Sequence, residues 1–330
     1  MQSADRNLAN RYLITGGTGF IGAYLVRRLV SMGCEVHILV RAQHSLWRLD
    51  DIKSRIHCWT GDLTEIHSIS RAVRQVKPEV VVHLGGGSMG QPWTTDFSQL
   101  SASLEVNLHG TLNLVQAVSQ AGVGLHSFVR IGGLLEYGEG PFPFVETQRE
   151  QPVSIYAATQ VATTAILNAI HRQCHFPVIC LRLSSVYGPG RALDFFLPAL
   201  IVAALKGSDF AMTSGEQQWD MLFIDDAVDA ILTAAHSDCP SGEVINIGSG
   251  EVHTLKEIAQ MVVKQIGNVG QLQIGAKAEP EGAIGNLICS IEKAERMLGW
   301  KPKTLLEDGL RETIQWYREN LDLLELKAEN

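Results

Sequence analysis

The sequence contains little of what membrane, nucleic-acid-binding or secreted proteins need. No apolar run approaches the ~18 residues of a transmembrane helix, and residues 1–11 are polar, unlike a signal peptide. The chain carries 27 basic and 35 acidic residues, a net charge of −8, with no block of lysine or arginine. A nucleic-acid or anionic membrane partner is therefore not expected. We predict a cytoplasmic protein whose ligand is a small molecule.

Cysteine is also scarce and scattered. The 6 cysteines form no C-x-x-C pair, and neither they nor the histidines show the spacing of a metal site. We expect buried, reduced thiols and no bound metal. The contents of 45% hydrophobic and 19% charged residues are ordinary for a globular protein, and 330 residues suffice for one large core or two joined ones.

Strand-like and helix-like segments alternate through the first half of the chain. Strands are expected at about 12–15, 35–40, 55–60, 79–84, 126–131 and 177–183, and long helices over 100–121 and 154–173. This alternation predicts an α/β fold of the Rossmann type, a doubly wound parallel sheet with helices on both faces.

The run TGGTGFIG, which begins at Thr15, is the most informative stretch. It joins a strand to a helix through glycines at three-residue spacing. Such glycines permit a tight turn, close approach of a pyrophosphate, and close packing of the helix on the strand, while the helix start offers free N–H groups to phosphate. A glycine-rich turn alone is often only a turn, but its place here predicts a dinucleotide site. The cofactor-binding residues predicted in this loop are Gly16, Thr18, Gly19, Phe20, Ile21 and Gly22.

After Gly190 the pattern changes, and the sequence shows helical stretches that are separated by short strands and by loops rich in glycine and proline. We predict a dinucleotide-binding domain over residues 1–183, with a later contribution from about 219–247. The rest, mainly 184–330, is predicted to form a smaller α+β substrate lobe. Ligands of open α/β sheets bind beyond the carboxyl ends of the strands. The cleft between that edge and the smaller lobe is the expected active site.

The end of the second strand bears on the choice of dinucleotide. NAD-binding proteins commonly carry Asp or Glu there to hold the ribose 2′-hydroxyl, whereas this strand ends in Val40-Arg41. An arginine can meet the 2′-phosphate of NADP, although it can equally be a solvated strand end. We predict NAD(P), with NADP slightly favoured. Asp62, followed by Leu63, is placed to accept a hydrogen bond from an adenine amino group.

Further cofactor contacts are expected where the fourth strand ends. Leu84 is followed there by Gly85-Gly86-Gly87, and the missing side chains would let the ribose and pyrophosphate come close. His83, at the end of the same apolar strand, is interpreted as a hydrogen-bonded core residue rather than a base.

Several further motifs follow one another in order. They include Asn107-x-x-Gly110-Thr111, Tyr137-Gly138, Tyr156-Ala157-Ala158-Thr159-Gln160, Arg182 to Gly190, Asp225-Asp226-Ala227 and Lys293-Ala294 to Pro302. With these motifs the chain resembles an extended short-chain dehydrogenase/reductase of the nucleotide-sugar epimerase/dehydratase group, from Arg11 to about Trp316. The resemblance implies a homodimer formed by the helices at 100–121 and 154–173. It also implies a supporting role for Asn107, which is expected to bond backbone near a kink in its helix and to lie by the cofactor.

The resemblance implies a Ser/Thr–Tyr–Lys catalytic set, with Tyr and Lys four residues apart on one helix face. Tyr156 matches the tyrosine, but Gln160 replaces the lysine and Gly133 the hydroxyl residue. The family lysine lowers the tyrosine pKa and holds the nicotinamide ribose. Without it a phenol, with a pKa of about 10, stays protonated at neutral pH and is a proton donor but a poor base. The two changes favour ketone reduction, and loss of catalysis is the alternative.

A second departure bears on the type of reaction. The family's 4,6-dehydratases place an Asp-Glu pair directly after the catalytic threonine, where this chain has Leu134 and Leu135. Because leucine cannot move a proton, we expect no 4,6-dehydration by that mechanism. Glu136 and Glu139 lie beside these positions and could substitute, but we interpret both as solvated loop carboxylates.

The substrate side departs from the family pattern too. Trp219 stands where an arginine normally meets the substrate diphosphate, and residues 278–282 offer no second arginine. Ser185 replaces an asparagine that commonly contacts the substrate, and Arg191 is the best local replacement cation. Gly133 completes the predicted substrate-binding set. A substrate without a full nucleotide diphosphate stays open.

We therefore predict an NAD(P)-dependent epimerase or ketoreductase acting on a sugar nucleotide or related sugar. Tyr156 is the expected proton donor, with Gln160 beside it. The alternative is a non-catalytic dinucleotide-binding scaffold or redox sensor derived from the same family.

Overall fold

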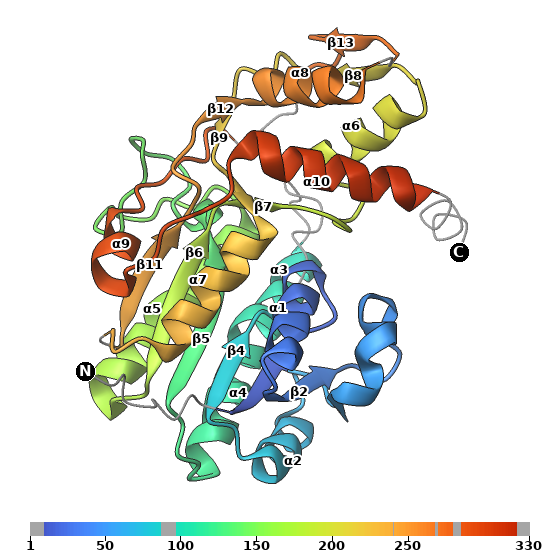
Figure 1. Ribbon diagram of the computed structural model, residues 1–330. Coiled ribbons are helices and arrows are strands. Elements are labelled where there is room, and N and C mark those ends of the chain that lie inside the picture. Colours follow the sequence, from blue (N-terminus) through green and yellow to red (C-terminus); the bar gives the residue numbers. More distant parts are fainter. Residues whose placement is uncertain (1–9, 87–96, 240, 268–269, 280–284, 322–330) are drawn as a thin grey trace, which may run out of the picture.

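A parallel sheet forms the centre of the molecule (Figure 1). The computed structural model describes residues 10–86, 97–239, 241–267, 270–279 and 285–321. Within these residues the sheet has seven strands in the order β3-β2-β1-β4-β5-β6-β11. The strands are β1 (Arg11–Thr15), β2 (Glu35–Val40), β3 (His57–Thr60), β4 (Val80–His83), β5 (Ser127–Gly133), β6 (Val178–Leu183) and β11 (Glu243–Ile247).

Helices cover both faces of the sheet because its strands alternate apolar side chains between two cores. Tyr12 and Ile14 of β1 belong to the core under one set of helices, and Leu13 between them belongs to the other. The first set is α1 (Phe20–Ser31) and α7 (Ile224–His236), and the second is α2 (Ile66–Val76), α4 (Gly110–Gln120) and α5 (Ile155–Cys174). The Rossmann-type fold expected from the sequence is confirmed.

The helix expected over 100–121 is composite. It consists of α3 (Phe97–Ser103), a π-helical turn η2 (Leu104–His109) and α4. The Thr111 hydroxyl donates to the Asn107 carbonyl oxygen at 2.6 Å, within the widened turn. Short connecting elements elsewhere are the 3-10 helices η1 (Trp47–Arg55) and η3 (Leu134–Glu136) and the helix α9 (Glu292–Leu298).

A smaller group of elements lies beyond the carboxyl edge of the sheet (Figure 1). Its helices are α6 (Phe196–Leu205), α8 (Leu255–Ile266) and α10 (Leu306–Glu319). Three strand pairs accompany them: β7 (Ser185–Tyr187) with β10 (Met221–Phe223), β9 (Gln218–Trp219) with β12 (His253–Thr254), and β8 (Phe210–Met212) with β13 (Leu272–Ile274). Thr254 caps the start of α8: its hydroxyl accepts from the Glu257 N–H, and the Glu257 carboxylate accepts from the Thr254 N–H.

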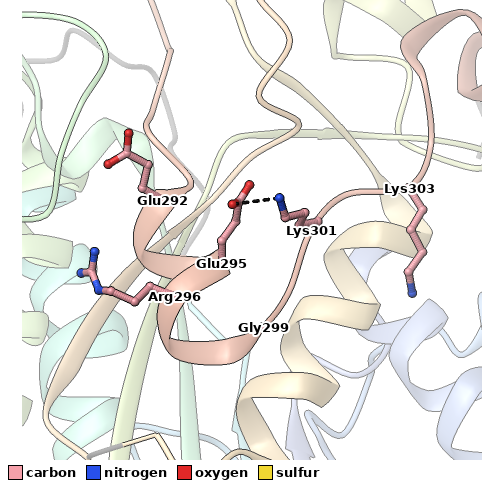
Figure 2. Close-up of a pocket in the computed structure, with 6 residues that line it drawn as sticks. All are labelled: Glu292, Glu295, Arg296, Gly299, Lys301 and Lys303. Atoms are coloured by element: carbon pink, nitrogen blue, oxygen red, sulfur yellow. Dashed lines mark ion pairs between the residues drawn. The ribbon is translucent and has the colours of Figure 1, made fainter.

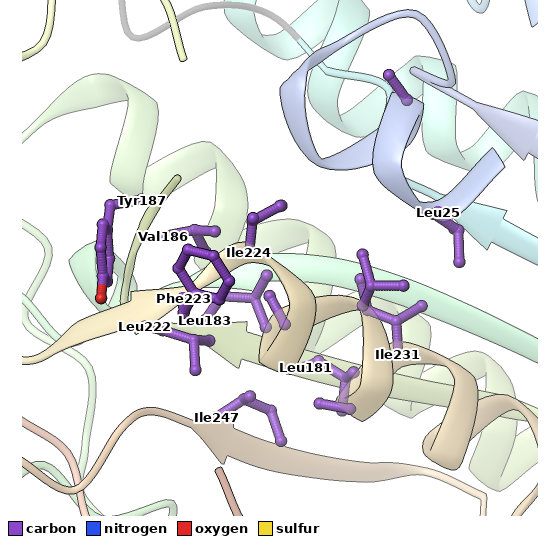
Figure 3. Close-up of a cluster of buried hydrophobic side chains, with 14 of the residues drawn as sticks. Leu25, Leu181, Leu183, Val186, Tyr187, Leu222, Phe223, Ile224, Ile231 and Ile247 are labelled. Carbon is purple, nitrogen blue, oxygen red and sulfur yellow. The ribbon is translucent and has the colours of Figure 1, made fainter. Parts of the chain in front are cut away.

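The chain returns from this group to complete the sheet. β11 pairs in parallel with β6, with Glu243 opposite Ile179 and Ile247 opposite Leu183. The α7 helix packs on β5 and β6, and Figure 3 shows its Ile224 and Ile231 in the same buried cluster as Leu181 of β6. The sheet therefore draws on sequence from both halves of the chain, while the domain boundary at residue 183 stays a prediction.

The expected burial of the cysteines is only partly right. Cys180 and Cys289 are buried, but Cys58 and Cys174 are exposed, because Cys58 lies on the edge strand β3 and Cys174 is the last residue of α5. Among the described residues, no helix is long and apolar enough to cross a membrane.

Candidate functional site

The glycine loop forms a cradle of bare backbone at the start of α1. Gly16 has φ +71°, and a Cβ there would lie 2.8 Å from the Gly85 nitrogen. A Cβ on Gly22 would lie 2.1 Å from the Gly16 carbonyl oxygen. The turn is closed by the Gly19 N–H, which donates to the Gly16 oxygen at 3.0 Å. Since α1 starts directly after Gly19, this cradle fits a pyrophosphate.

The carboxyl ends of β1 and β4 meet beside this loop. The Leu84 N–H donates to the Thr15 oxygen at 3.1 Å, and the Gly85 N–H donates to the Thr15 hydroxyl at 3.0 Å. The Leu63 side chain faces the same place, 3.1 Å from where a Gly85 Cβ would be. The predicted residues Leu63, Leu84 and Gly85 are thus brought together with the glycine loop, Gly86 continues this strand end, and Gly87 lies outside the described residues.

Arg41 and Asp62 lie at the ends of the neighbouring strands β2 and β3. The Arg41 side chain is exposed, and Asp62 is half-buried. One Asp62 oxygen accepts from both the N–H and the hydroxyl of Thr64, at 2.9 and 2.8 Å. The pKa of Asp62 is lowered by the Thr64 backbone and hydroxyl bonds and by the positive charge of Arg41.

His83 has the core environment expected from the sequence. Its Nδ1 lies 2.6 Å from the Thr15 hydroxyl, and its Nε2 lies 2.8 Å from the Thr111 hydroxyl. Burial, aided by the charge of Arg130, lowers its pKa to about 3, so the ring is neutral at physiological pH. Both ring nitrogens are engaged, and His83 is a structural residue.

Asn107 is buried in the π-helical turn η2. Its amide nitrogen donates to the Thr159 hydroxyl on α5 at 2.9 Å. The Thr163 hydroxyl of the same helix donates to the Asn107 carbonyl oxygen at 3.2 Å, so η2 packs against α5. The Asn107 Oδ1 lies 3.0 Å from where a Gly86 Cβ would be.

Tyr156 and Gln160 lie one turn apart at the start of α5. The helix begins after Ser154, whose hydroxyl accepts from the Ala157 N–H at 3.2 Å. Burial raises the pKa of the partly exposed Tyr156, while Arg130 lowers it and Glu136 raises it, and the net direction is upward. Tyr156 therefore carries its proton at neutral pH.

A buried network of charges lies behind this helix. Glu136 is 1% exposed and pairs with Arg130 at 2.6 Å and with Arg182 at 3.1 Å. Arg182 also pairs with Glu150 at 2.7 Å. The interpretation of Glu136 as a solvated loop carboxylate is wrong, because η3 turns it inward between β5 and β6. Burial raises its pKa, but the two arginines and the Thr164 hydroxyl outweigh burial, and Glu136 stays ionised.

The segment around Gly133 contains several residues for which the sequence analysis made predictions. Gly133 ends β5, and a Cβ added there would meet only the Leu183 oxygen, at 3.6 Å. Leu134 is buried and Leu135 half-buried. Glu139 is exposed, as expected.

Three of the predicted substrate residues lie close together, because Gly133 is opposite Leu183, two residues before Ser185, and Ser185 bonds the neighbour of Trp219. The Trp219 indole N–H donates to the Gly285 oxygen at 3.1 Å, and the Ser185 N–H donates to the Asp220 oxygen at 3.2 Å. Arg191 lies instead beside the glycine loop, with its guanidinium 3.7 Å from the Phe195 ring centroid and 5.4 Å from that of Phe20. Burial lowers the pKa of Arg191 to about 10, which leaves it charged at neutral pH. Among the described residues, no carboxylate lies within ion-pair distance of it.

A separate surface hollow is lined by charged side chains from residues 292–303 (Figure 2). Glu295 of α9 pairs there with Lys301 at 3.0 Å. None of its lining residues belongs to the glycine loop or to α5, so it is not part of the site. In the part of the chain that the structure describes, no cluster of His, Cys, Asp and Glu is arranged to hold a metal ion.

Taken together, the strand order, the glycine cradle and the tyrosine on the helix behind β5 define a Rossmann-type dinucleotide-binding protein. A family model described as "NAD dependent epimerase/dehydratase family" matches residues 12–248. The chain belongs to this family.

Curated relatives are similar over nearly their full lengths. The mouse (Mus musculus) dTDP-D-glucose 4,6-dehydratase is 27% identical, with 95% of this chain and 90% of the relative covered. The dTDP-L-rhamnose 4-epimerase of Burkholderia thailandensis is 24% identical, with 94% and 96% covered. Among solved structures, UDP-glucose 4-epimerase of Thermus thermophilus in complex with NAD has a TM-score of 0.81 and 27% identity over 93% of this chain and 99% of that chain. The relatives thus include both epimerases and dehydratases.

Sequence reasoning missed Arg130 as a site residue. Its guanidinium donates to the carbonyl oxygen and to the side-chain oxygen of Gln160. A signal was present, because Arg130 and Arg182 are charged residues inside otherwise apolar strands, and a buried charge needs a partner.

Proposed function

We propose that this protein is an NAD(P)-dependent enzyme that reduces or epimerises a carbon of a sugar nucleotide, with Tyr156 as proton donor. The observation that carries the proposal is the partly exposed phenol of Tyr156, held protonated by burial at the start of α5, at a sheet edge that also carries the glycine cradle. The sugar-nucleotide epimerases and dehydratases among the relatives support this substrate class.

The cofactor and Tyr156 have separate roles in the proposed reaction. A nicotinamide dinucleotide bound at the glycine cradle supplies or accepts a hydride. In a reduction, Tyr156 donates its proton to the sugar oxygen that gains negative charge, and takes a proton back from solvent before the next cycle. In an epimerisation, the ionised form of Tyr156 would first accept the proton of the sugar hydroxyl that loses its hydride, and would return this proton when the ketone is reduced again. With no hydroxyl side chain at Gly133, the reacting oxygen has one donor fewer than the family pattern provides. Because burial raises the pKa of Tyr156 and keeps it protonated, proton donation is favoured over proton abstraction.

Dehydration at C4 and C6 is not part of the proposal, although several relatives are 4,6-dehydratases. The side chains of Leu134 and Leu135 have no acidic proton to transfer. Glu136, the nearest carboxylate in sequence, is held between two arginines. Its lowered pKa keeps it ionised, so it has no proton to donate, and its burial keeps it from a substrate.

For the cofactor, the exposed Arg41 supports acceptance of NADP as well as NAD, because its guanidinium can meet a 2′-phosphate. Isothermal titration with both dinucleotides, on wild type and on Arg41→Ala, tests this. A loss confined to NADP supports the assignment, and an equal loss for both or for neither contradicts it. The homodimer and the cytoplasmic location stay predictions.

The function is tested with Tyr156→Phe on a panel of UDP- and dTDP-sugars, with product detection by NMR. We expect turnover to fall at least ~100-fold while dinucleotide affinity stays within about threefold. Equal turnover in the variant contradicts the role of Tyr156. A wild type that binds dinucleotide but converts no sugar supports the non-catalytic alternative.

A further inference from the structure

A positive charge lies next to residue 160, where the family pattern has a lysine and this chain has Gln160. Tyr156, Gln160 and Thr164 are spaced by four residues and share one face of α5. Arg130 of β5, which is 2% exposed, lies behind this face. Its Nη2 donates to the Gln160 carbonyl oxygen at 3.2 Å and to the Gln160 Oε1, and its Nη1 donates to the Thr164 hydroxyl at 2.8 Å. The guanidinium is thus fixed along the helix that carries Tyr156.

The contact with Arg130 also fixes the orientation of the Gln160 amide. A guanidinium has only donors, so Gln160 must turn its carbonyl oxygen toward it. The two N–H donors of the same amide then point away from Arg130. Position 160 therefore presents N–H donors with a positive charge behind them, which are the two properties of an ammonium group.

The charge of Arg130 is offset only in part by its acidic neighbour. Glu136 divides its single negative charge between Arg130 and Arg182, at 2.6 and 3.1 Å. The second carboxylate of the network, Glu150, pairs with Arg182 at the far end. The Nη2 edge of Arg130 meets Gln160 rather than a carboxylate. The positive edge of the network therefore meets α5 at Gln160. The Glu136 carboxylate meets the same helix one turn further on, where it accepts from the Thr164 hydroxyl at 2.8 Å.

We propose that Arg130 is a positioning residue for proton transfer at Tyr156, acting through Gln160 in the place of the lysine that the family pattern puts at residue 160. The inference rests on the proposed function and assigns the source of positive charge in that site. It explains why Gln160 and an arginine inside β5 occur together. Proton transfer at Tyr156 thus depends on a residue that touches neither substrate nor cofactor.

The first test is the isosteric Gln160→Glu, which keeps the acceptor for Arg130 but removes the amide donors and neutralises the cation. Its matched control is Gln173→Glu, the same change at an exposed position of α5. Ionisation of residue 156 is followed in the cofactor-free protein by ¹⁹F NMR after replacement of tyrosine by 3,5-difluorotyrosine, which ionises near neutral pH. The resonance is assigned with Tyr156→Phe.

We expect the ionisation midpoint at residue 156 to rise by about one to two pH units in Gln160→Glu and to stay unchanged in Gln173→Glu. In the unlabelled enzyme kcat should fall at least ~10-fold, with the KM for the sugar within about threefold. A midpoint that does not move in a Gln160→Glu protein of wild-type melting temperature overturns the proposal.

The second test moves the cation onto the helix. Arg130→Met should raise the same midpoint, and the double variant Arg130→Met/Gln160→Lys should bring the midpoint and kcat back toward wild type. A stable double variant that recovers neither contradicts the proposal, and if Arg130→Met does not fold, the Gln160→Glu result decides. An inactive Tyr156→Phe with an unmoved midpoint refutes only this inference, whereas a fully active Tyr156→Phe refutes the proposed function.

Discussion

Two adjacent glycines at the end of β5 allow a sharp test of the buried charge network. A Cβ on Gly132 would lie 2.0 Å from the Glu136 Oε1 and 2.2 Å from the Arg130 Nη1, which are the two atoms of the 2.6 Å ion pair. A Cβ on Gly133 would meet nothing nearer than the Leu183 oxygen at 3.6 Å. Gly132→Ala therefore forces the ion pair apart, and Gly133→Ala does not.

The expected magnitude follows from the burial of the pair. Separating a fully buried ion pair costs about 3–5 kcal/mol, because each charge keeps its desolvation penalty and loses its partner. At roughly 2 °C per kcal/mol for a chain of this size, Gly132→Ala should melt about 6–10 °C below wild type. Gly133→Ala should stay within about 1 kcal/mol of wild type, since it also stiffens the unfolded chain.

Urea denaturation and thermal unfolding at neutral pH measure both variants against wild type. The adjacent position is the control for any general intolerance of β5 to alanine. A Gly132→Ala protein that loses less than about 1 kcal/mol would refute the reasoning, and so would an equal loss in Gly133→Ala.

Three further predictions concern the site. Gly22→Ala, whose Cβ would lie 2.1 Å from a backbone oxygen, should weaken dinucleotide binding at least ~10-fold by calorimetry. The control Gly124→Ala, with no atom within 4 Å of its Cβ, should bind as wild type does. Equal affinities in the two variants would contradict the assignment of the glycine loop as the dinucleotide site. The pKa of His83 is about 3 in the folded protein and about 6.5 in the unfolded chain, so its contribution to the free energy of unfolding is complete above pH 6.5 and is lost as the pH falls. Urea denaturation should show about 2 kcal/mol less stability at pH 5 than at neutral pH. If His83→Asn shows the same dependence of stability on pH as wild type, the prediction is contradicted. Arg191→Met should weaken UDP or dTDP binding about tenfold, with Arg191→Lys intermediate, and unchanged affinity would remove Arg191 from the site.

The sheet and its glycine loop could be predicted because their signals are local. An apolar run followed by three spaced glycines specifies a strand, a turn and a helix within a dozen residues. The π-helical turn η2 was not predicted, and its Asn107 contacts α5, which lies far along the chain.

The environment of Glu136 could not be predicted in this way. In sequence it stands in a loop after glycines and leucines, which is typical of a solvated carboxylate. Its partners Arg130 and Arg182 lie on β5 and β6, and only the pairing of these two strands, with Gly132 opposite Arg182, brings them to it. The position of Arg191 beside Phe20 depends in the same way on a contact between distant segments.

The position of β11 far along the sequence has a consequence for folding during synthesis. A nascent chain that has left the ribosome only as far as Leu183 has made six strands of the sheet, but β6 then forms its edge. All six residues of β6 are buried in the finished protein, and an open edge of this kind invites pairing with other chains. The α7 helix that covers it is also still missing. The dinucleotide half of this protein therefore completes its folding only after Ile247 has been synthesised, and a fragment that ends at Leu183 is expected to aggregate.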